Sequence, residues 1–218
     1  MTWLALETAT DRASVAIGRS AASAHEEYLD GARRHAAAIL PMIERLLGRL
    51  ELSLGELRSV VIADGPGSFT GLRVGATVAK ALAATRGLPV FAASSLMGRA
   101  HAAAAGREEP VLVTSDALRG DAYAAVYRFG NGQVETIAAP AVISREQLSA
   151  LAPAGAIVAD AVPASARELI ALTALPGGAV PIMDLDAWEP VYGRPAEAQA
   201  QWERTHGRPL SSAHGLAR

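Results

Sequence analysis

The N-terminal part of the chain alternates between short apolar runs and polar turns. The runs LALET, ASVAIGR and AHEEYL, at residues 4–8, 13–19 and 24–29, predict three strands of an antiparallel meander. The period then changes, because apolar residues recur three and four positions apart between residues 34 and 50. This spacing predicts an amphipathic helix with one apolar stripe along its length.

The next segments alternate between strand-like and helix-like patterns. LRSVVIAD and LPVFAASS, at residues 57–64 and 88–95, predict buried strands because both are short, apolar and bounded by turn residues. A helix is expected over residues 70–85 and a shorter one over residues 96–105.

The second half of the sequence repeats this order in a smaller form. LALETATDRASVAIG and VLVTSDALRGDAYAAVY each run from an apolar strand into an acidic residue, Glu7 or Asp116, and then through a turn into a second strand. VETIAA, a helix over residues 144–151, AIVAD and a helix over residues 164–175 follow. The repeat predicts an α/β fold of two similar lobes facing each other, residues 1–108 and residues 109–218, the second reduced and ending in a tail.

Composition narrows the range of functions. Half of the residues are hydrophobic and the formal charge is -2, so the chain lacks the basic excess of a protein that binds nucleic acid by itself. The absence of cysteine excludes a disulfide framework, a thiolate nucleophile and a cysteine zinc site. No window approaches the roughly 18 apolar residues of a membrane span, and the N-terminus lacks a basic leader pattern. We therefore expect a cytoplasmic protein without a membrane segment.

The stretch ADGPGSFTGLRVG, residues 63–75, joins a predicted strand to a predicted helix. Gly65-Pro66-Gly67 suits a type II turn, with Gly67 at positive φ, and Ser68 or Thr70 can cap the helix. A glycine turn before a capped helix can hold an anion. However, the stretch matches neither the phosphate-binding G-x-x-x-x-G-K-[ST] pattern nor the dinucleotide G-x-G-x-x-G fingerprint.

The helix that follows this stretch has one face of very small residues. Gly71, Gly75 and Ala79 are four residues apart, so another backbone can approach that face closely. Val74, Val78 and Leu82 form an apolar shoulder beside it. The spacing fits packing inside the chain and packing against a second chain equally well.

The sequence offers few other candidates for a catalytic nucleophile or a metal ligand. No serine has the G-x-S-x-G framing of a nucleophile elbow. His101 has no histidine at helical spacing, which is typical of a surface or core histidine and not of a metal ligand.

Five motifs together resemble the bacterial TsaB family: LALETATDRASVAIG, HAAAILPMIERLL, GPGSFTGLRVG, LPVFAASSLM and EPVYGR, which span residues 4–194. The resemblance implies the two-lobed fold of actin, sugar kinases and heat-shock ATPases. It also implies a role in the threonylcarbamoyl modification of the tRNA adenosine next to the anticodon. In that pathway TsaB is the non-catalytic partner of its paralogue TsaD, TsaE is a further ATPase partner and TsaC supplies the activated intermediate. An older description of the wider family is M22 glycopeptidase.

The sequence departs from the catalytic paralogue at the positions that carry chemistry. The metal-binding H-x-x-x-H pair of TsaD corresponds to Ser95 and Arg99, and the first-strand aspartate of the family is Glu7. We therefore expect no catalytic residue, no metal site and no tightly bound cofactor, with ATP or ADP only in the partner complex. The alternative is an enzyme acting alone, either an M22-like peptidase or a small ATP-dependent phosphotransferase.

The two amphipathic helices provide the candidate partner surface. We expect TsaD to form a heterodimer through it, with TsaE joining the complex and tRNA bound indirectly, and the isolated chain to form homodimers. A charge at Ile43 or Val78 should then abolish co-purification with TsaD. The candidate residues are His35, Ile39, Met42, Ile43, Leu46, Leu47, Gly71, Val74, Gly75, Val78 and Leu82.

Overall fold

A computed structural model describes residues 1–31, 34–117, 120–160, 162–194 and 205–207. Its first sheet has six strands in the order β10-β5-β4-β1-β2-β3. The strands β1 (Trp3–Glu7), β2 (Arg12–Gly18) and β3 (His25–Asp30) form the antiparallel meander that the sequence predicts. β4 (Ser59–Ala63) and β5 (Val90–Ala93) then continue the sheet in parallel with β1.

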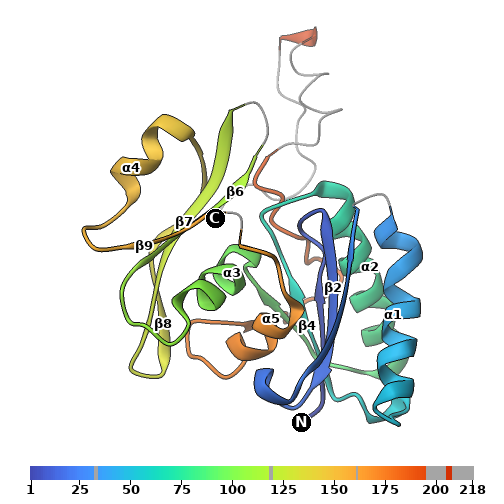
Figure 1. The fold of residues 1–218 in the computed structure, drawn as a ribbon. Helices are drawn as coiled ribbons and strands as arrows, with labels where there is room; N and C mark the ends of the chain where they lie inside the picture. Colours follow the sequence, from blue (N-terminus) through green and yellow to red (C-terminus); the bar gives the residue numbers. More distant parts are fainter. Residues whose placement is uncertain (32–33, 118–119, 161, 195–204, 208–218) are drawn as a thin grey trace.

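The second sheet repeats this topology with four strands in the order β8-β7-β6-β9. β6 (Val111–Asp116), β7 (Asp121–Gly130) and β8 (Gln133–Ser144) are antiparallel, and β9 (Ile157–Ala159) is parallel to β6. The predicted two-lobed α/β fold is confirmed, and the second copy is smaller, as the sequence indicates (Figure 1).

The helices cover the two sheets in layers (Figure 1). α1 (His35–Arg49) and α2 (Phe69–Arg86) pack on the outer face of the first sheet. α3 (Ser95–Ala104) and α5 (Ala166–Leu172) lie between the sheets, and the single-turn α4 (Leu148–Leu151) covers the outer face of the second. Short 3-10 turns occur at η1 (Ala21–Ser23), η3 (Leu54–Glu56) and η4 (Arg145–Gln147).

Successive side chains of β1 point alternately to the two faces of the first sheet. Leu4 and Leu6 point to the α1–α2 side, while Ala5 points into the layer between the lobes. In the interlobe core the buried residues of the first sheet are alanines and Val61, with Trp3 and Phe91 packed at its side, while Tyr127 and Leu169 come from the second half.

The chain returns to the first lobe near its C-terminal end. β10 (Val180–Pro181) pairs antiparallel with β5 at the edge of the first sheet, within the stretch that the sequence analysis assigns to the second lobe. A two-residue strand containing proline has no readable period, so no sequence pattern predicts it. Residues 195–204 and 208–218, most of the expected tail, lie outside the described residues.

Candidate functional site

The loop between β4 and α2 combines a tight turn with a helix cap. Ser68 is the N-cap of α2, and its hydroxyl accepts a hydrogen bond from the Gly71 amide at 3.2 Å, as predicted. The type II turn prediction is wrong, because Gly65 and not Gly67 has positive φ, at 113°, and the Gly65-Pro66 peptide is cis.

Backbone from elsewhere in the chain closes around this loop. The Val191 amide donates to Asp64 O at 2.6 Å, and the Ser68 amide donates to Ala9 O at 2.7 Å. A Cβ atom on Gly65 would collide with the Val191 carbonyl, and one on Gly67 with the Ala9 carbonyl. The chain therefore packs closely against both glycines of this loop, and the Ser68 amide is already bonded to a backbone carbonyl.

The small-residue face of α2 packs closely, but inside the chain. A Cβ atom on Gly71 would collide with the Thr8 carbonyl at the end of β1, and one on Gly75 would lie 2.6 Å from Thr8 Oγ1. Ala79 on the same face is fully buried. This face of α2 therefore packs against Thr8, the residue that follows β1.

The apolar stripe of α1 is likewise used within the chain. Ile39, Met42, Ile43, Leu46 and Leu47 are between 0% and 8% exposed, and they form one core with Leu82, Val74, Val78 and the outer face of the first sheet. His35 is 1% exposed, with Nε2 3.1 Å from Asp11 O. In this chain the buried residues of the set therefore face its own core, and the partner surface on α1 and α2 stays a prediction. A stripe of this width must be covered, and the chain's own sheet covers it.

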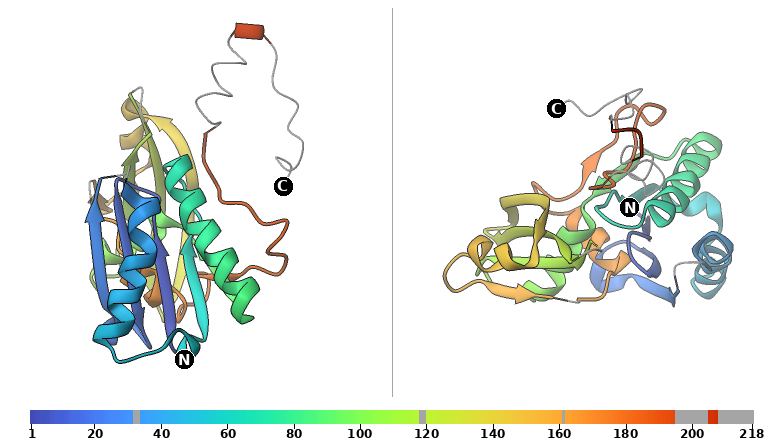
Figure 2. Two further views of the ribbon diagram at one scale, coloured as in Figure 1. Left: turned by 90° about the vertical axis from the view of Figure 1, so that its right-hand side faces the viewer. Right: turned by 90° about the horizontal axis from the view of Figure 1, so that it is seen from above.

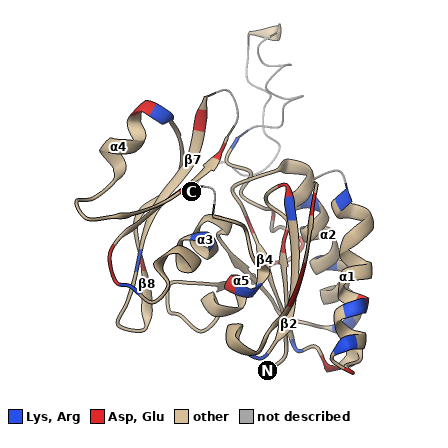
Figure 3. Cartoon of the chain, in the orientation of Figure 1, with Lys and Arg blue, Asp and Glu red and all other residues tan. Residues whose placement is uncertain are grey.

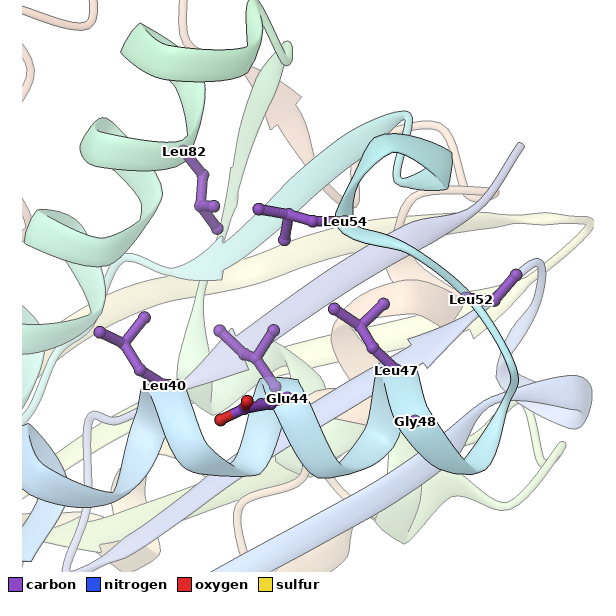
Figure 4. Close-up of a pocket in the computed structure, with 8 residues that line it drawn as sticks. Leu40, Glu44, Leu47, Gly48, Leu52, Leu54 and Leu82 are labelled. Atoms are coloured by element: carbon purple, nitrogen blue, oxygen red, sulfur yellow. The ribbon is translucent and has the colours of Figure 1, made fainter.

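A shallow groove of about 400 Å³ remains between α1, α2 and the segment that joins α1 to β4 (Figure 4). Leu40, on the outer side of α1, is 59% exposed. Helical spacing does not show which edge of an apolar stripe stays uncovered, so it gives no signal that Leu40 is exposed. The residues that line the groove are Leu40, Ile43, Glu44, Leu47, Gly48, Leu52, Leu54 and Leu82.

The acid at the end of β1 lies in the junction between the lobes. Glu7 is 1% exposed, and its Oε1 accepts a hydrogen bond from the Ala9 amide at 2.8 Å. Burial raises the pKa of Glu7 to about 7, although that hydrogen bond, the nearby Ser95 hydroxyl and the charge of Arg99 oppose the rise. The Ser95 hydroxyl is near this carboxylate but makes no hydrogen bond within normal distance.

Asp64 and Tyr127 extend this cluster toward the loop. Burial raises the pKa of Asp64 to about 6. Burial also raises the pKa of Tyr127 to about 12, and its hydroxyl donates to Ser94 Oγ at 3.3 Å. The Ser94 hydroxyl in turn donates to Gly65 O at 3.3 Å, which connects the second lobe to the loop of the first.

Arg99 is the residue that the family resemblance places at the second histidine of the metal pair of TsaD. It is 5% exposed, and its Nε donates to Val162 O at 2.6 Å. Burial lowers the pKa of its guanidinium, although the negative charges of Glu7 and Asp160 act to raise that pKa. The described residues contain no group of three or more His, Asp or Glu side chains that could hold a metal.

His101 pairs with a carboxylate and does not stand alone. Its Nδ1 lies 2.6 Å from Glu168 Oε2, and its ring meets Phe129 edge-on with centroids 5.1 Å apart. This local packing agrees with its interpretation as a core or surface histidine.

Comparison with known proteins identifies the family. The family model described as TsaD, tRNA N6-adenosine threonylcarbamoyltransferase, matches residues 25–181. The tRNA threonylcarbamoyladenosine biosynthesis protein TsaB of Escherichia coli is 35% identical over 156 residues, which cover 67% of each chain. The chain belongs to the TsaB family. It thereby also belongs to the wider family that the TsaD model describes.

Further relatives agree with this membership. The TsaB protein of Bacillus subtilis is 34% identical over 63% of this TsaB-family chain, and that of Haemophilus influenzae is 39% identical over 56% of it. The matched parts span 59% and 52% of those two relatives. A solved structure of YeaZ from Pseudomonas aeruginosa has a TM-score of 0.69 and 25% identity, with 80% of this chain and 98% of that chain covered. A second structure, described as similar to peptidase YeaZ, has a TM-score of 0.72 and 27% identity, with 88% and 99% covered.

In this TsaB-family chain no helix among the described residues is long and apolar enough to cross a membrane.

Proposed function

We propose that this chain acts in the cytoplasm, in the formation of threonylcarbamoyladenosine in tRNA, as a non-catalytic subunit that binds and activates the transferase TsaD. The names of its TsaB relatives support the pathway. The observation that carries the proposed role is the apolar groove between α1 and α2, a surface suited to a partner helix.

Two features support a non-catalytic role. Ser95 and Arg99 replace the metal-binding pair of the paralogue, and Arg99 is held by a backbone carbonyl of the second lobe. The loop that could hold a phosphate is covered by Val191 and Ala9. Any ATP or ADP would accordingly belong to the assembled complex, in which TsaE and, through TsaD, tRNA also take part.

The groove specifies the chemistry of the partner surface. Leu40, Leu52 and Leu54 offer aliphatic contacts, and Glu44 carries the only charge among the described residues that line it. Charges on the other side of α1 are already paired, since Arg45 and Arg49 each lie 2.8 Å from a carboxylate oxygen of Glu27 on β3. Figure 3 shows the basic and acidic positions of α1 in blue and red. A partner helix with leucine-like anchors and one cation near Glu44 fits this arrangement.

Replacing Leu40 with glutamate tests the groove. We expect Leu40→Glu to weaken TsaD binding at least tenfold, about 1.4 kcal/mol, because an exposed apolar anchor becomes a charge beside Glu44. Affinity is measured by titrating immobilised TsaD with the purified chain. The melting temperature should stay near that of the wild type, since Leu40 is 59% exposed.

Val158→Glu is the matched control, because Val158 is 64% exposed on β9 of the other lobe. Equal affinity of the Leu40 and Val158 variants would contradict docking in the groove. Ile43 is a poor test position, because it is 4% exposed and a charge there must enter the core.

Reconstitution separates the proposed role from the alternative of an enzyme acting alone. Modification of unmodified tRNA by TsaC, TsaD and TsaE should require this chain, measured as threonylcarbamoyladenosine formed per tRNA. Peptidase or phosphotransferase turnover by the purified chain without partners would overturn the non-catalytic assignment.

A further inference from the structure

A segment near the C-terminus, residues 184–194, crosses from the first lobe to the second on the outside of the molecule (Figure 2). We refer to it as the clamp segment. It follows β10, runs beside α2 and the loop after β4, and reaches the beginning of β7. Its described contacts fall into three groups, one on each lobe and one at the junction.

The contacts on the first lobe involve two cations of α2. Lys80 Nζ donates to Trp188 O at 2.8 Å and lies 5.9 Å from the centre of the Trp188 ring. Arg73 donates from Nε to the Tyr192 hydroxyl at 3.4 Å and stacks over Phe69 at 4.2 Å. Lys80 is the only lysine in the sequence, and its ammonium donates a hydrogen bond to a backbone carbonyl of the clamp segment.

The contacts at the junction lie directly over the loop after β4. The Val191 amide donates to Asp64 O at 2.6 Å. The ring of Tyr192 packs on Phe69, with centroids 4.5 Å apart. These contacts place the clamp segment against the backbone of Asp64 and the ring of Phe69.

The contacts on the second lobe use the first residues of β7. The Tyr123 hydroxyl donates to Tyr192 O at 3.2 Å, and the guanidinium of Arg194 pairs with the carboxylate of Asp121. Gly193 lies between the lobes, because a Cβ atom there would be 2.6 Å from Tyr123 Cε1 and 2.9 Å from Pro66 Cβ. One short segment thus holds β7 of one lobe against the loop of the other.

We propose that residues 184–194 form a conformational clamp that holds the two lobes closed over Glu7 and Asp64, anchored by Lys80 on the first lobe and by Asp121 and Tyr123 on the second. The layer of α3 and α5 joins the lobes behind this site and remains when the clamp is released. Release on the Asp121–Tyr123 side exposes the loop after β4 and leaves each lobe's own sheet intact. The proposal concerns the isolated chain and does not depend on its partner.

The test uses the double variant Asp121→Asn and Tyr123→Phe in the full chain. The sequence has no cysteine, so Arg19→Cys and Gln133→Cys, exposed positions on different lobes, allow specific spin labelling. We expect a broader interlobe distance distribution in the double variant and at least tenfold faster hydrogen exchange of the Val191 amide. Lys80→Met should accelerate that exchange as well, since it removes the donor to Trp188 O.

Arg128→Gln is the matched control, because it breaks the exposed pair with Glu135 inside the second lobe, at 2.9 Å, without touching the clamp segment. It should leave both measurements at wild-type values. Unchanged distances together with unchanged Val191 exchange in the double variant would overturn the proposal. If the double variant does not fold, Tyr123→Phe alone, which keeps the ring in place, decides the question by the same two measurements.

Discussion

The free energy of unfolding is expected to fall by about 3 kcal/mol between pH 4.5 and pH 7 on account of Glu7 alone. Burial raises its pKa from 4.5 to about 7, so over this range the folded chain keeps a proton that the unfolded chain releases. The stabilisation is fully present below pH 4.5 and is lost as the pH rises through 7. Urea unfolding at intervals of half a pH unit measures it.

Glu7→Gln isolates this contribution. Glutamine keeps an acceptor for the Ala9 amide but cannot ionise, so the variant should lack the part of the pH dependence that belongs to Glu7. Glu109→Gln, at an exposed position, should follow the wild-type profile. Asp64 adds a second fall between pH 3.8 and about 6, and because its charge also raises the pKa of Glu7 the two acids titrate as a coupled pair. Parallel profiles for the wild type and Glu7→Gln would contradict the assignment.

Gly71→Ala is expected to destabilise the fold by about 3 kcal/mol, near the upper end for an overpacked site. The new methyl group would collide with the carbonyl oxygen of Thr8, a backbone atom directly after β1 that cannot rotate away as a side chain can. The methyl group would also lie 3.4 Å from Nδ1 of the buried His35. Thermal and urea unfolding of the variant measure the loss.

Gly48→Ala is the matched control in the neighbouring helix. No atom lies within 4 Å of a Cβ added at Gly48, so alanine there should stabilise the chain by about 0.5–1 kcal/mol through helix propensity. Gly75→Ala should cost less than Gly71→Ala, because its new methyl group meets the Thr8 hydroxyl, which can rotate. Equal stability of the Gly71 and Gly48 variants would show that α2 does not depend on the close approach to Thr8.

Most helices and strands follow from the sequence because local patterns specify them. The stripe of α1 and the cap at Ser68 each rest on spacing or on side-chain chemistry within a few residues. The duplicated lobes follow from element order, since both halves begin with a meander whose first strand ends on an acidic residue, Glu7 or Asp116.

The candidate site follows from the sequence much less well. Helical spacing identifies Ile43 and Leu46 as residues to be covered, but it does not say whether a sheet of the same chain or another protein covers them. Leu40 has the same side chain as its buried neighbours and differs only in its angular position at the edge of the stripe. The clamp segment depends on contacts between residues 69 or more positions apart, for example Tyr123 with Tyr192 and Lys80 with Trp188, and no local pattern encodes them.

By itself the sequence determined the strands, the helices, the duplicated order and the need for closely packed faces, because periodicity and turn chemistry act over a few residues. Only the tertiary structure decided which surfaces cover those faces. The glycine face of α2 meets Thr8, the stripe of α1 meets its own sheet, and Glu7 is buried near Ser95 and Arg99. The physical reason is that burial is a property of residues brought together from distant parts of the chain, and a raised pKa or an uncovered groove exists only after that packing is complete.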